Sequence, residues 1–402
     1  MPRSTPTGAH DAMRSKNQQD VFELIHRHGP ISRAEIAARL QLSRAAITNI
    51  TAELIGRQLI YEARAAEPGG VGRRAILIDV VYDGAAVAGI KLSNSGLTCA
   101  LTNLNAEVLV TVEQPLSSTE PDVVLNAVEA ALSRLREAAA KGGHPTEVAA
   151  LGISLPGLVD VDGGTVRHSP LLGWTHTPIG SLLEERLGMP VVIENDVNAL
   201  ALGEAWFGHG ILHPTFLVVT LGRGVGLGIV IDGALFRGPN GGAGEFGHVP
   251  LDPNGPVSSH SARGTVEAFL ADDALLADAH RRGAPLPDGS RPEDLVRLAE
   301  EGNAPARASL EAAGAMLGRA LGIIVNLFAP TLVVLSGEGM RAAPFLIPEA
   351  KRVLRDTAFG DLGDQVELVV DAWGDDTWAR GAAALAASRH LVEAAARTGG
   401  AG

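Results

Sequence analysis

A segment near the middle of the chain carries an amide and carboxylates in a place where a small-molecule site could form. The segment IENDVNALALGE contains Asn195 and Asp196 and follows the apolar residues MPVV, which predict a short buried strand. The residues after Asp196 predict the beginning of a helix. Polar side chains at the C-terminal end of a strand, beside a helix start, lie where α/β sheets bind small polar molecules. Asp196 could act there as a general base or hold a ligand.

The elements that would position this segment fall into two similar halves. From Ala85 onward, predicted strands surround a tight turn, and a helix over residues 122–141 and the strand VAALGISLP follow. After the Asp196 segment, PTFLVVTLGRGVGLGIVIDGALFRG begins a second strand–turn–strand hairpin. Because both halves begin with a hairpin that has Ser or Gly at its bend, we expect a duplicated α/β unit that forms two lobes around a cleft.

The first 80 residues have a different pattern, which predicts a winged helix-turn-helix. Apolar spacing predicts helices over residues 17–28, 33–40 and 44–58, and SRAE forms a capping box in which Ser32 and Glu35 bond reciprocally. The three-residue turn QLS ends at Ser43, which can cap the third helix. The strands LIYEARA and RRAILIDV flank the loop AEPGGVG and form the wing. A small helical protein-interaction domain is the alternative.

The predicted recognition helix presents a polar face opposite its apolar stripe. Ile47, Ile50 and Leu54 would face inward, while Arg44 and Asn49 would face outward. In a helix-turn-helix this outer face enters the major groove of DNA. The residues expected to contact DNA are Ser43, Arg44, Thr48, Asn49, Arg73 and Arg74.

The charge distribution and the cysteine content exclude several classes of protein. The formal net charge is −13, yet residues 1–80 carry 11 Lys and Arg against 8 Asp and Glu, and the remainder carries 22 against 38. Only the first 80 residues are therefore suited to approach phosphate. The single cysteine, Cys99, excludes internal disulfides and a multi-cysteine zinc site. The apolar run near residue 325 is broken by Asn326 and Pro330, and the N-terminus lacks a signal-peptide core, so we expect a cytoplasmic location.

From about Ala85 to Ser388 the body contains, in order, the segments SLPGLVD, HSPLLGW, IENDVNALALGE, TLGRGVGLGIVIDG, GAGEFGHVPLDPNGP and FAPTLVVLSGEG. In these segments the body resembles the ROK family of repressors and sugar kinases. The resemblance implies an α/β fold: a winged helix-turn-helix over residues 1–80, then a two-lobed actin/hexokinase-like (ribonuclease H-like) domain. Lobe 1 would span residues 81–200, lobe 2 residues 201–388 with a C-terminal helix returning toward lobe 1, and residues 389–402 a tail.

The resemblance also implies a set of sugar-binding residues. Carried over by motif, they are Asn195, Asp196, Glu245, His248 and Glu267. Carboxylates, an amide and an imidazole suit a sugar, because each hydroxyl is both a donor and an acceptor with fixed directions. Any one of these residues could instead be structural, for example a helix-capping Asp196 or a core His248.

The first hairpin departs from the pattern of the family's kinases, which is D-x-G-G-T or a close variant. Residues 91–95 are Lys-Leu-Ser-Asn-Ser, so an ammonium replaces the carboxylate that would orient a metal ion. Phosphoryl transfer needs that metal ion. In the second hairpin Arg223 stands where the family usually has Thr. We therefore predict no catalytic residues and no enzyme activity, with Asp196 holding the sugar. An ATP-dependent sugar kinase that carries a DNA-binding domain is the alternative.

A second departure concerns zinc. The family's C-x-C-G-x-x-G-C-x-E motif is SSHSARGTVE in this chain, so Ser258, His260 and Thr265 occupy the three cysteine positions and Glu267 is retained. Structural zinc takes four ligands, mostly Cys and His. His248 and His260 would leave two positions empty, so we expect no family-type zinc, no other metal ligand and no cofactor.

These observations predict a sugar-responsive transcriptional regulator, specifically a repressor. Its partners would be operator DNA and a small-molecule sugar effector, without a membrane, and the chain would act as a homodimer or homotetramer. A regulator that binds no sugar and is controlled by a protein partner is a further alternative.

Overall fold

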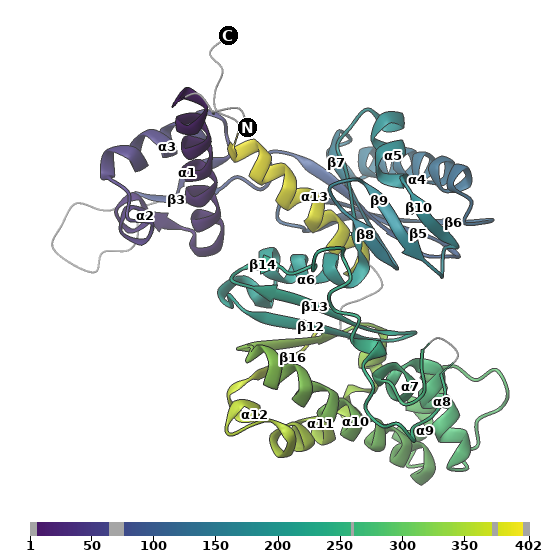
Figure 1. Cartoon of the computed structure of the whole chain (residues 1–402). Helices are drawn as coiled ribbons and strands as arrows, with labels where there is room; N and C mark the ends of the chain where they lie inside the picture. Colours follow the sequence, from purple (N-terminus) through teal and green to yellow (C-terminus); the bar gives the residue numbers. More distant parts are fainter. Residues whose placement is uncertain (1–5, 64–75, 259–260, 372–376, 397–402) are drawn as a thin grey trace. The chain divides into compact units, whose positions relative to one another are not determined.

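The computed structural model describes the chain except residues 1–5, 64–75, 259–260, 372–376 and 397–402 (Figure 1). The chain folds as two compact units. The first unit contains residues 1–157, 161–194 and 378–402, and the second contains residues 158–160 and 195–377.

The N-terminal part of the first unit is a winged helix-turn-helix. Its elements are α1 (Pro6–His28), β1 (Ile31–Ser32), α2 (Arg33–Leu40), α3 (Arg44–Gly56), β2 (Ile60–Ala63) and β3 (Leu77–Val80). The strands form an antiparallel sheet in the order β1-β3-β2. The three helices were predicted, but α1 begins at Pro6 rather than near Asn17, and α3 ends at Gly56. Strand β1 was not expected.

Local signals explain why these helices form. The Ser32 hydroxyl accepts from the Glu35 backbone N–H at 3.2 Å, so half of the predicted capping box is present. The Glu35 carboxylate, however, accepts from Arg39 at 2.8 Å and not from the backbone of Ser32. The Ser43 hydroxyl accepts from the Ala46 N–H at 3.1 Å, which caps α3 as predicted.

The rest of the first unit is built on a five-stranded sheet in the order β11-β7-β4-β5-β6. Its elements are β4 (Ala86–Leu92), β5 (Gly96–Asn103), β6 (Val108–Pro115), α4 (Pro121–Gly142), β7 (Val148–Leu155), β9 (Thr165–Ser169), β10 (Trp174–Thr177), α5 (Ile179–Leu187), β11 (Val191–Asn195) and α13 (Thr377–Ala396). Helix α13 lies directly on β4 and β7. A Cβ at Gly89 or Gly152 would collide with the backbone of this helix, so the close packing requires glycine.

The second unit repeats this strand order in the sheet β14-β13-β12-β15-β16. Its elements are β8 (Leu158–Asp160), α6 (Asp196–Phe207), η1 (His209–Leu212), β12 (Phe216–Leu221), β13 (Val225–Ile231), β14 (Ala234–Leu235), η2 (Phe246–His248), α7 (Val266–Leu270), α8 (Asp272–Arg281), α9 (Pro292–Glu300), α10 (Ala304–Phe328), β15 (Leu332–Ser336), η3 (Glu338–Ala342), α11 (Ala343–Thr357), α12 (Leu362–Gln365) and β16 (Glu367–Val370). In both sheets the first two strands are antiparallel and the first strand also pairs in parallel with a later one.

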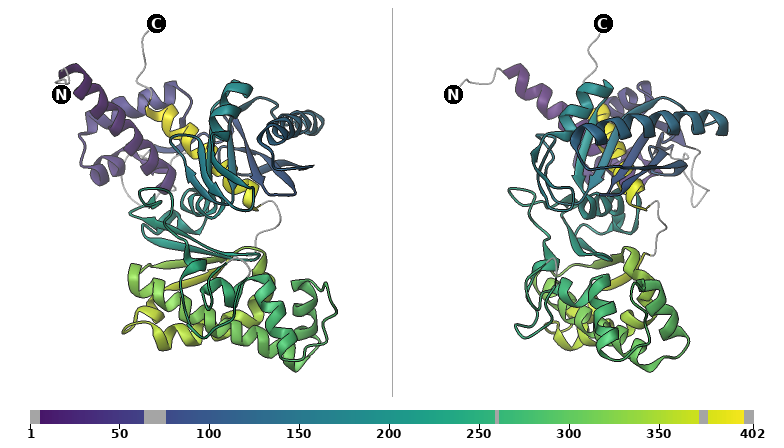
Figure 2. Two further views of the ribbon diagram at one scale, coloured as in Figure 1. Left: turned by 45° about the vertical axis from the view of Figure 1, so that its right-hand side comes forward. Right: turned by 90° about the vertical axis from the view of Figure 1, so that its right-hand side faces the viewer.

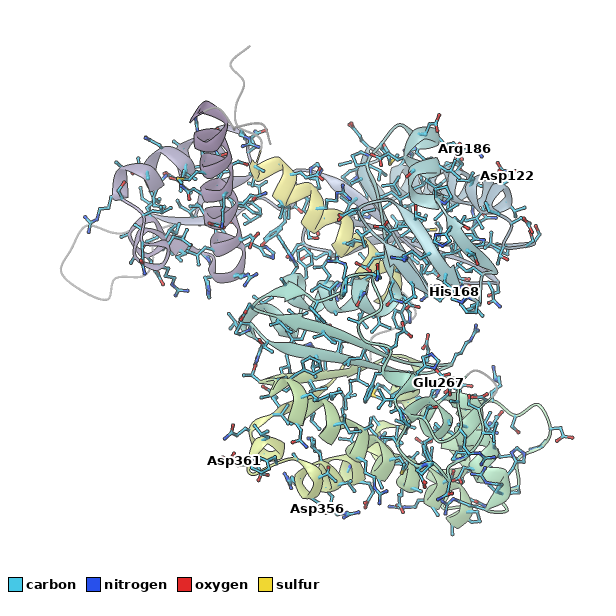
Figure 3. All side chains as sticks on the ribbon, viewed as in Figure 1. Asp122, His168, Arg186, Glu267, Asp356 and Asp361 are labelled. Atoms are coloured by element: carbon cyan, nitrogen blue, oxygen red, sulfur yellow. The ribbon has the colours of Figure 1, made fainter. Side chains whose placement is uncertain are left out.

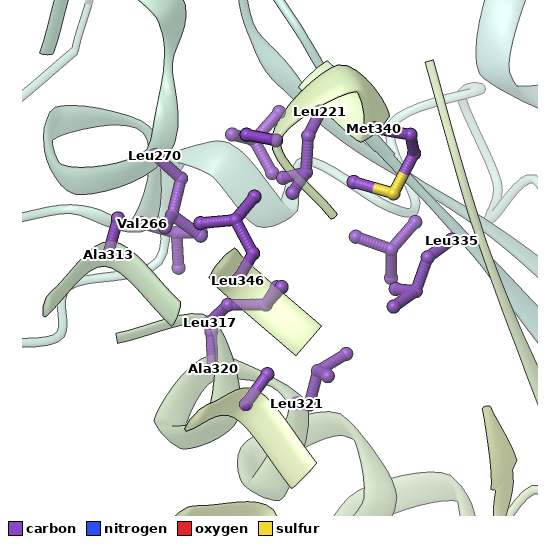
Figure 4. Packing of buried hydrophobic residues seen from close by; sticks show 14 of the residues in the cluster. Leu221, Val266, Leu270, Ala313, Leu317, Ala320, Leu321, Leu335, Met340 and Leu346 are labelled. Carbon is purple, nitrogen blue, oxygen red and sulfur yellow. The ribbon is translucent and has the colours of Figure 1, made fainter. Parts of the chain in front are cut away.

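The core of the second unit lies between its sheet and α10. Figures 1 and 2 show α10 and α11 on one face of the sheet and α6 on the other. Leu317 and Leu321 of α10 pack near Leu335 of β15 and Leu346 of α11 (Figure 4). Helix α10 is long and apolar enough to cross a membrane, but most of its apolar window is buried inside this unit. The apolar run that Asn326 and Pro330 interrupt is thus the end of α10 followed by β15.

Two expected boundaries differ from the structure. Helix α13 continues to Ala396, whereas we expected a tail to begin at residue 389. The division between the units falls at Glu194–Asn195, slightly before the expected lobe boundary at residue 200. The helix continues because alanine-rich turns beyond Ser388 keep an apolar face, on which Leu391 and Ala395 are buried.

Candidate ligand site and nucleic-acid surface

Asn195 and Asp196 begin α6 at the end of β11. The Asn195 side-chain oxygen accepts from the N–H groups of Val197 and Asn198 at 3.0 and 3.2 Å, so Asn195 is the helix cap. Asp196 Oδ1 accepts from the Val197 N–H at 3.0 Å. A carboxylate in the first turn is also stabilised by the positive end of the helix dipole. Both side chains are therefore held in fixed directions at the start of α6.

Glu245 and His248 lie on the segment that follows β14, where η2 forms a single turn. Glu245 Oε2 and His248 Nε2 are 3.8 Å apart, and each side chain is about half exposed, at 51% and 53%. Polar side chains at this exposure can meet a ligand without a large desolvation cost. A ligand beside this pair could therefore bond both the Glu245 carboxylate, which accepts hydrogen bonds, and the His248 imidazole.

Glu267 comes from the first turn of α7 and is labelled in Figure 3. Its Oε2 accepts from the backbone N–H of Val225, in the second hairpin, at 3.3 Å. A Cβ placed on Gly247 would lie 3.2 Å from the same oxygen, so Glu267 lies against the backbone between Glu245 and His248. One carboxylate thereby joins the hairpin to the η2 segment.

The charges of these residues act on one another. Partial burial raises the pKa of the Glu245 carboxyl; His248 opposes this, and the negative charges of Asp196 and Glu267 add to it. Such mutual effects require short separations. The structure thus brings Asp196, Glu245, His248 and Glu267 together in the second unit, with Asn195 adjacent in the chain. A cluster of hydrogen-bonding groups of this kind can bind a polyhydroxylated ligand.

Two glycines of the second hairpin, Gly226 and Gly228, allow it to pack closely against α6. A Cβ on Gly226 would collide with the Val197 side chain, and a Cβ on Gly228 would lie 2.5 Å from the Ala201 Cβ. This close approach of helix and strand places the start of α6, with Asp196, beside the hairpin. Arg223 at the bend is exposed. Helix packing therefore explains Gly226 and Gly228, whereas Gly222 and Gly224 lie close to the carboxylates of Glu338 and Glu267.

On the recognition helix α3, the side chains predicted to contact DNA are on the outer face. Ser43, Arg44, Thr48 and Asn49 are exposed, whereas Ile47 and Leu54 are fully buried. The hydroxyl of Thr48 donates to the Arg44 carbonyl at 2.8 Å, which keeps it close to the helix. Arg73 and Arg74, expected in the wing, lie outside the described residues.

Comparison with known proteins agrees with both parts of the chain. Residues 87–389 match the model of the ROK family, and residues 15–65 match that of the MarR family. The DNA-binding transcriptional dual regulator NagC of Escherichia coli strain K12 is 31% identical over 355 residues, 87% of this chain and 86% of that protein. The chain belongs to the ROK family.

Other relatives and solved structures cover nearly the whole length. The xylose repressor of Bacillus subtilis strain 168 is 26% identical over 94% of this ROK chain and 97% of that protein. A crystal structure of a ROK family transcriptional regulator, a homolog of the E. coli MLC protein, has a TM-score of 0.82 at 28% identity, covering 96% of this chain and 98% of that one. The predicted fold class is confirmed.

The ROK body also resembles kinases. A ROK family glucokinase from Streptomyces griseus, solved with glucose and AMPPNP, has a TM-score of 0.65 at 28% identity and covers 76% of this chain and 100% of that one. The part of this ROK chain that it leaves uncovered is comparable in size to the helix-turn-helix region. Whether this chain could also act as a kinase therefore depends on the structure of the first hairpin, between β4 and β5.

That hairpin is closed by its own side chains. Ser93 Oγ accepts from the N–H groups of Ser95 and Gly96 at 3.3 and 3.1 Å and donates to the Gly96 carbonyl at 3.0 Å. Lys91 Nζ lies 4.5 Å from the centre of the Trp378 ring, at the start of α13. Sequence reasoning missed Trp378, because nothing in its neighbourhood pointed to Lys91, which is far away in the chain.

The loop at the family's zinc motif is held by hydrogen bonds among the described residues. Ser261 donates to Thr265 Oγ1 at 2.7 Å, and Thr265 donates to the Ala262 carbonyl at 3.0 Å. The Ser258 hydroxyl accepts from the Ser261 N–H at 3.2 Å. Backbone bonds from Val266 to Val249 and from Leu251 to Gly264 close the base of the loop. His260 lies outside the described residues.

Proposed function

We propose that this ROK protein is a sugar-responsive transcriptional repressor. The observation that carries the proposal is the combination, in one chain, of an exposed recognition-helix face and a cluster of three carboxylates with an imidazole. Relatives that cover most of the chain are named as transcriptional regulators and repressors. Asn195, Asp196, Glu245, His248 and Glu267 bind the sugar hydroxyls, and Ser43, Arg44, Thr48, Asn49, Arg73 and Arg74 contact operator DNA.

The protein works as a linked two-site system. A sugar that binds one state of the chain more tightly shifts the population toward that state, and the operator affinity changes by the same coupling free energy. The chain acts in the cytoplasm as a homodimer or homotetramer, because two recognition helices read a palindromic operator.

The chain does not transfer phosphate. The ammonium of Lys91 stands where the family's kinases have a carboxylate, and it lies over Trp378. The Ser93 hydroxyl occupies the bend that a phosphate would approach. We also propose that the loop over residues 250–266 carries no zinc, because Ser258 and Thr265 make hydrogen bonds in place of thiolate ligands.

A ligand screen with a DNA-binding readout tests the proposal. The full chain is screened by thermal shift against neutral and phosphorylated sugars, and each hit is then titrated into a complex with the operator. We expect one class of sugar to raise the unfolding temperature and to change operator affinity. A sugar that is phosphorylated in the presence of ATP and Mg²⁺ would support the kinase alternative, and the absence of any sugar hit would contradict the proposed effector.

A further inference from the structure

Three metal-ligating side chains meet in the second unit, apart from the residues assigned to the sugar. Glu204 is in the last turn of α6, His209 begins η1, and Asp371 directly follows β16. One ligand atom of each residue lies within 4.8 Å of the ligand atoms of the other two. The segments come from distant parts of the chain, so the fold itself assembles this cluster.

The carboxylate of Glu204 has an unusual environment. Its side chain is 1% exposed, and Oε1 has no hydrogen-bond partner in the part of the chain that the structure describes. The other oxygen, Oε2, accepts from the His209 backbone N–H at 2.8 Å and lies 3.1 Å from His209 Nδ1. A buried carboxylate oxygen without a partner is rare in folded proteins, and its presence indicates a group that occupies that position in solution.

We propose that Glu204, His209 and Asp371 bind a divalent first-row transition-metal ion. Two carboxylates and one imidazole are ligands that Zn²⁺ and Mn²⁺ accept, and three protein ligands leave room for water. Ligands around a tetrahedral ion at about 2.1 Å lie roughly 3.4 Å apart, close to the present separation of Oε2 and Nδ1. The positive charge would also compensate the buried carboxylate of Glu204, which lies 3.1 Å from His209 Nδ1.

The site is preorganised and local. The Asp371 backbone N–H donates to the Leu335 carbonyl at 2.9 Å, which fixes the end of β16 next to β15. The Glu204 side chain is fixed by burial and by its contacts to His209, whose own side chain is 43% exposed. An ion could therefore enter from the His209 side and join the end of α6 to the end of β16. This departs from the expectation that the chain binds no metal, and the site is separate from the zinc-motif loop.

Metal titration of the full chain tests the proposal without sugar or DNA. The chain is stripped with a chelator, returned to chelator-free buffer, and titrated with Zn²⁺ or Mn²⁺ by calorimetry, with thermal unfolding in parallel. We expect one ion per chain and a higher unfolding temperature. His209→Ala should weaken binding by about tenfold or more, since a lost ligand costs at least as much as a lost outer-shell partner. Because the His209 side chain is exposed, this variant should fold as the parent chain does.

Two control variants locate the ion. His213→Ala removes a partly buried histidine that is near in the sequence and bonds Thr331 at 2.9 Å, and it should leave binding unchanged. His248→Ala should also leave binding unchanged, which separates this site from the zinc-motif loop. Asp371→Asn should weaken binding as His209→Ala does. Binding that is equal in the parent and in His209→Ala, or no binding at all, would overturn the proposal and assign the buried oxygen to a proton or a water molecule.

Discussion

The Lys91 ammonium lies 4.5 Å from the centre of the Trp378 ring, which joins the end of β4 to the first turn of α13. A cation over an indole face is attracted by the negative charge on the ring face, and such a contact contributes about 0.5–2 kcal/mol. Lys91 therefore has a structural partner at the position where the family resemblance implies a carboxylate in the kinases. The contact attaches the first hairpin to α13.

We predict that Lys91→Asp removes this contact without creating a kinase. The free energy of unfolding of the variant should be lower by about 0.5–2 kcal/mol, because the cation–π contact is lost. It should still transfer no phosphate from ATP to sugar, because Ser93 continues to fill the bend. Chemical denaturation and a coupled phosphorylation assay measure the two effects. Phosphorylation by the unmodified chain, lost in Asp196→Asn, would show that the chain is an enzyme.

Asp196→Asn should weaken sugar binding by about 1–3 kcal/mol, roughly tenfold to several hundredfold. The substitution keeps the shape of the side chain but replaces an acceptor by a donor. Operator affinity without sugar should be unchanged, while the sugar concentration needed for the response rises. Asp288→Asn, on an exposed loop, is the matched control and should behave as the parent chain. Equal sugar affinity in the two variants would show that Asp196 does not bind the sugar.

Glu245→Gln should raise stability and lower sugar affinity together. Because the pKa of Glu245 is raised in the folded chain, its ionised form is disfavoured there. The resulting cost is present at neutral pH and disappears as the pH falls through the raised pKa. The variant should therefore be more stable than the parent near pH 7 and equally stable at acidic pH. Thermal unfolding of both proteins at several pH values measures the difference.

Glu293→Gln is a control that should change stability in the opposite direction to Glu245→Gln. Hydrogen bonding and Arg341 lower the pKa of Glu293, so its ionised form is favoured in the folded chain and contributes stability above its ordinary pKa. That substitution should lower stability at neutral pH and leave sugar affinity unchanged. If both substitutions shifted stability in the same direction, the electrostatic assignment of Glu245 would be wrong.

Arg44→Ala and Asn49→Ala should each weaken binding to the specific operator by about 1–3 kcal/mol per lost base contact. Both side chains are exposed on α3, so the fold and the sugar affinity should be unaffected. Electrophoretic or fluorescence titration against operator and random DNA measures the difference. Arg352→Ala, on α11, removes the same charge elsewhere and should bind the operator normally. An equal loss on random DNA would indicate phosphate contacts only.

The sequence determined the elements whose signals are local. Ser32 and Ser43 cap α2 and α3 as predicted, because a cap acts on a backbone N–H three residues away. The outward direction of Arg44 and Asn49 followed from the helical period relative to Ile47. The family resemblance likewise placed Asp196, Glu245 and Glu267 in one set before any geometry was known.

Only the tertiary structure decided which distant residues meet. Lys91 and Trp378 are far apart in the sequence, and so are Glu204 and Asp371. Sheet register and helix packing bring each pair together in space. The collisions that a Cβ at Gly152 or Gly226 would cause likewise exist only once α13 and α6 pack on their strands. Local periodicity contains no information on such pairs, because contacts across a fold depend on how whole elements pack and not on the spacing within any one of them.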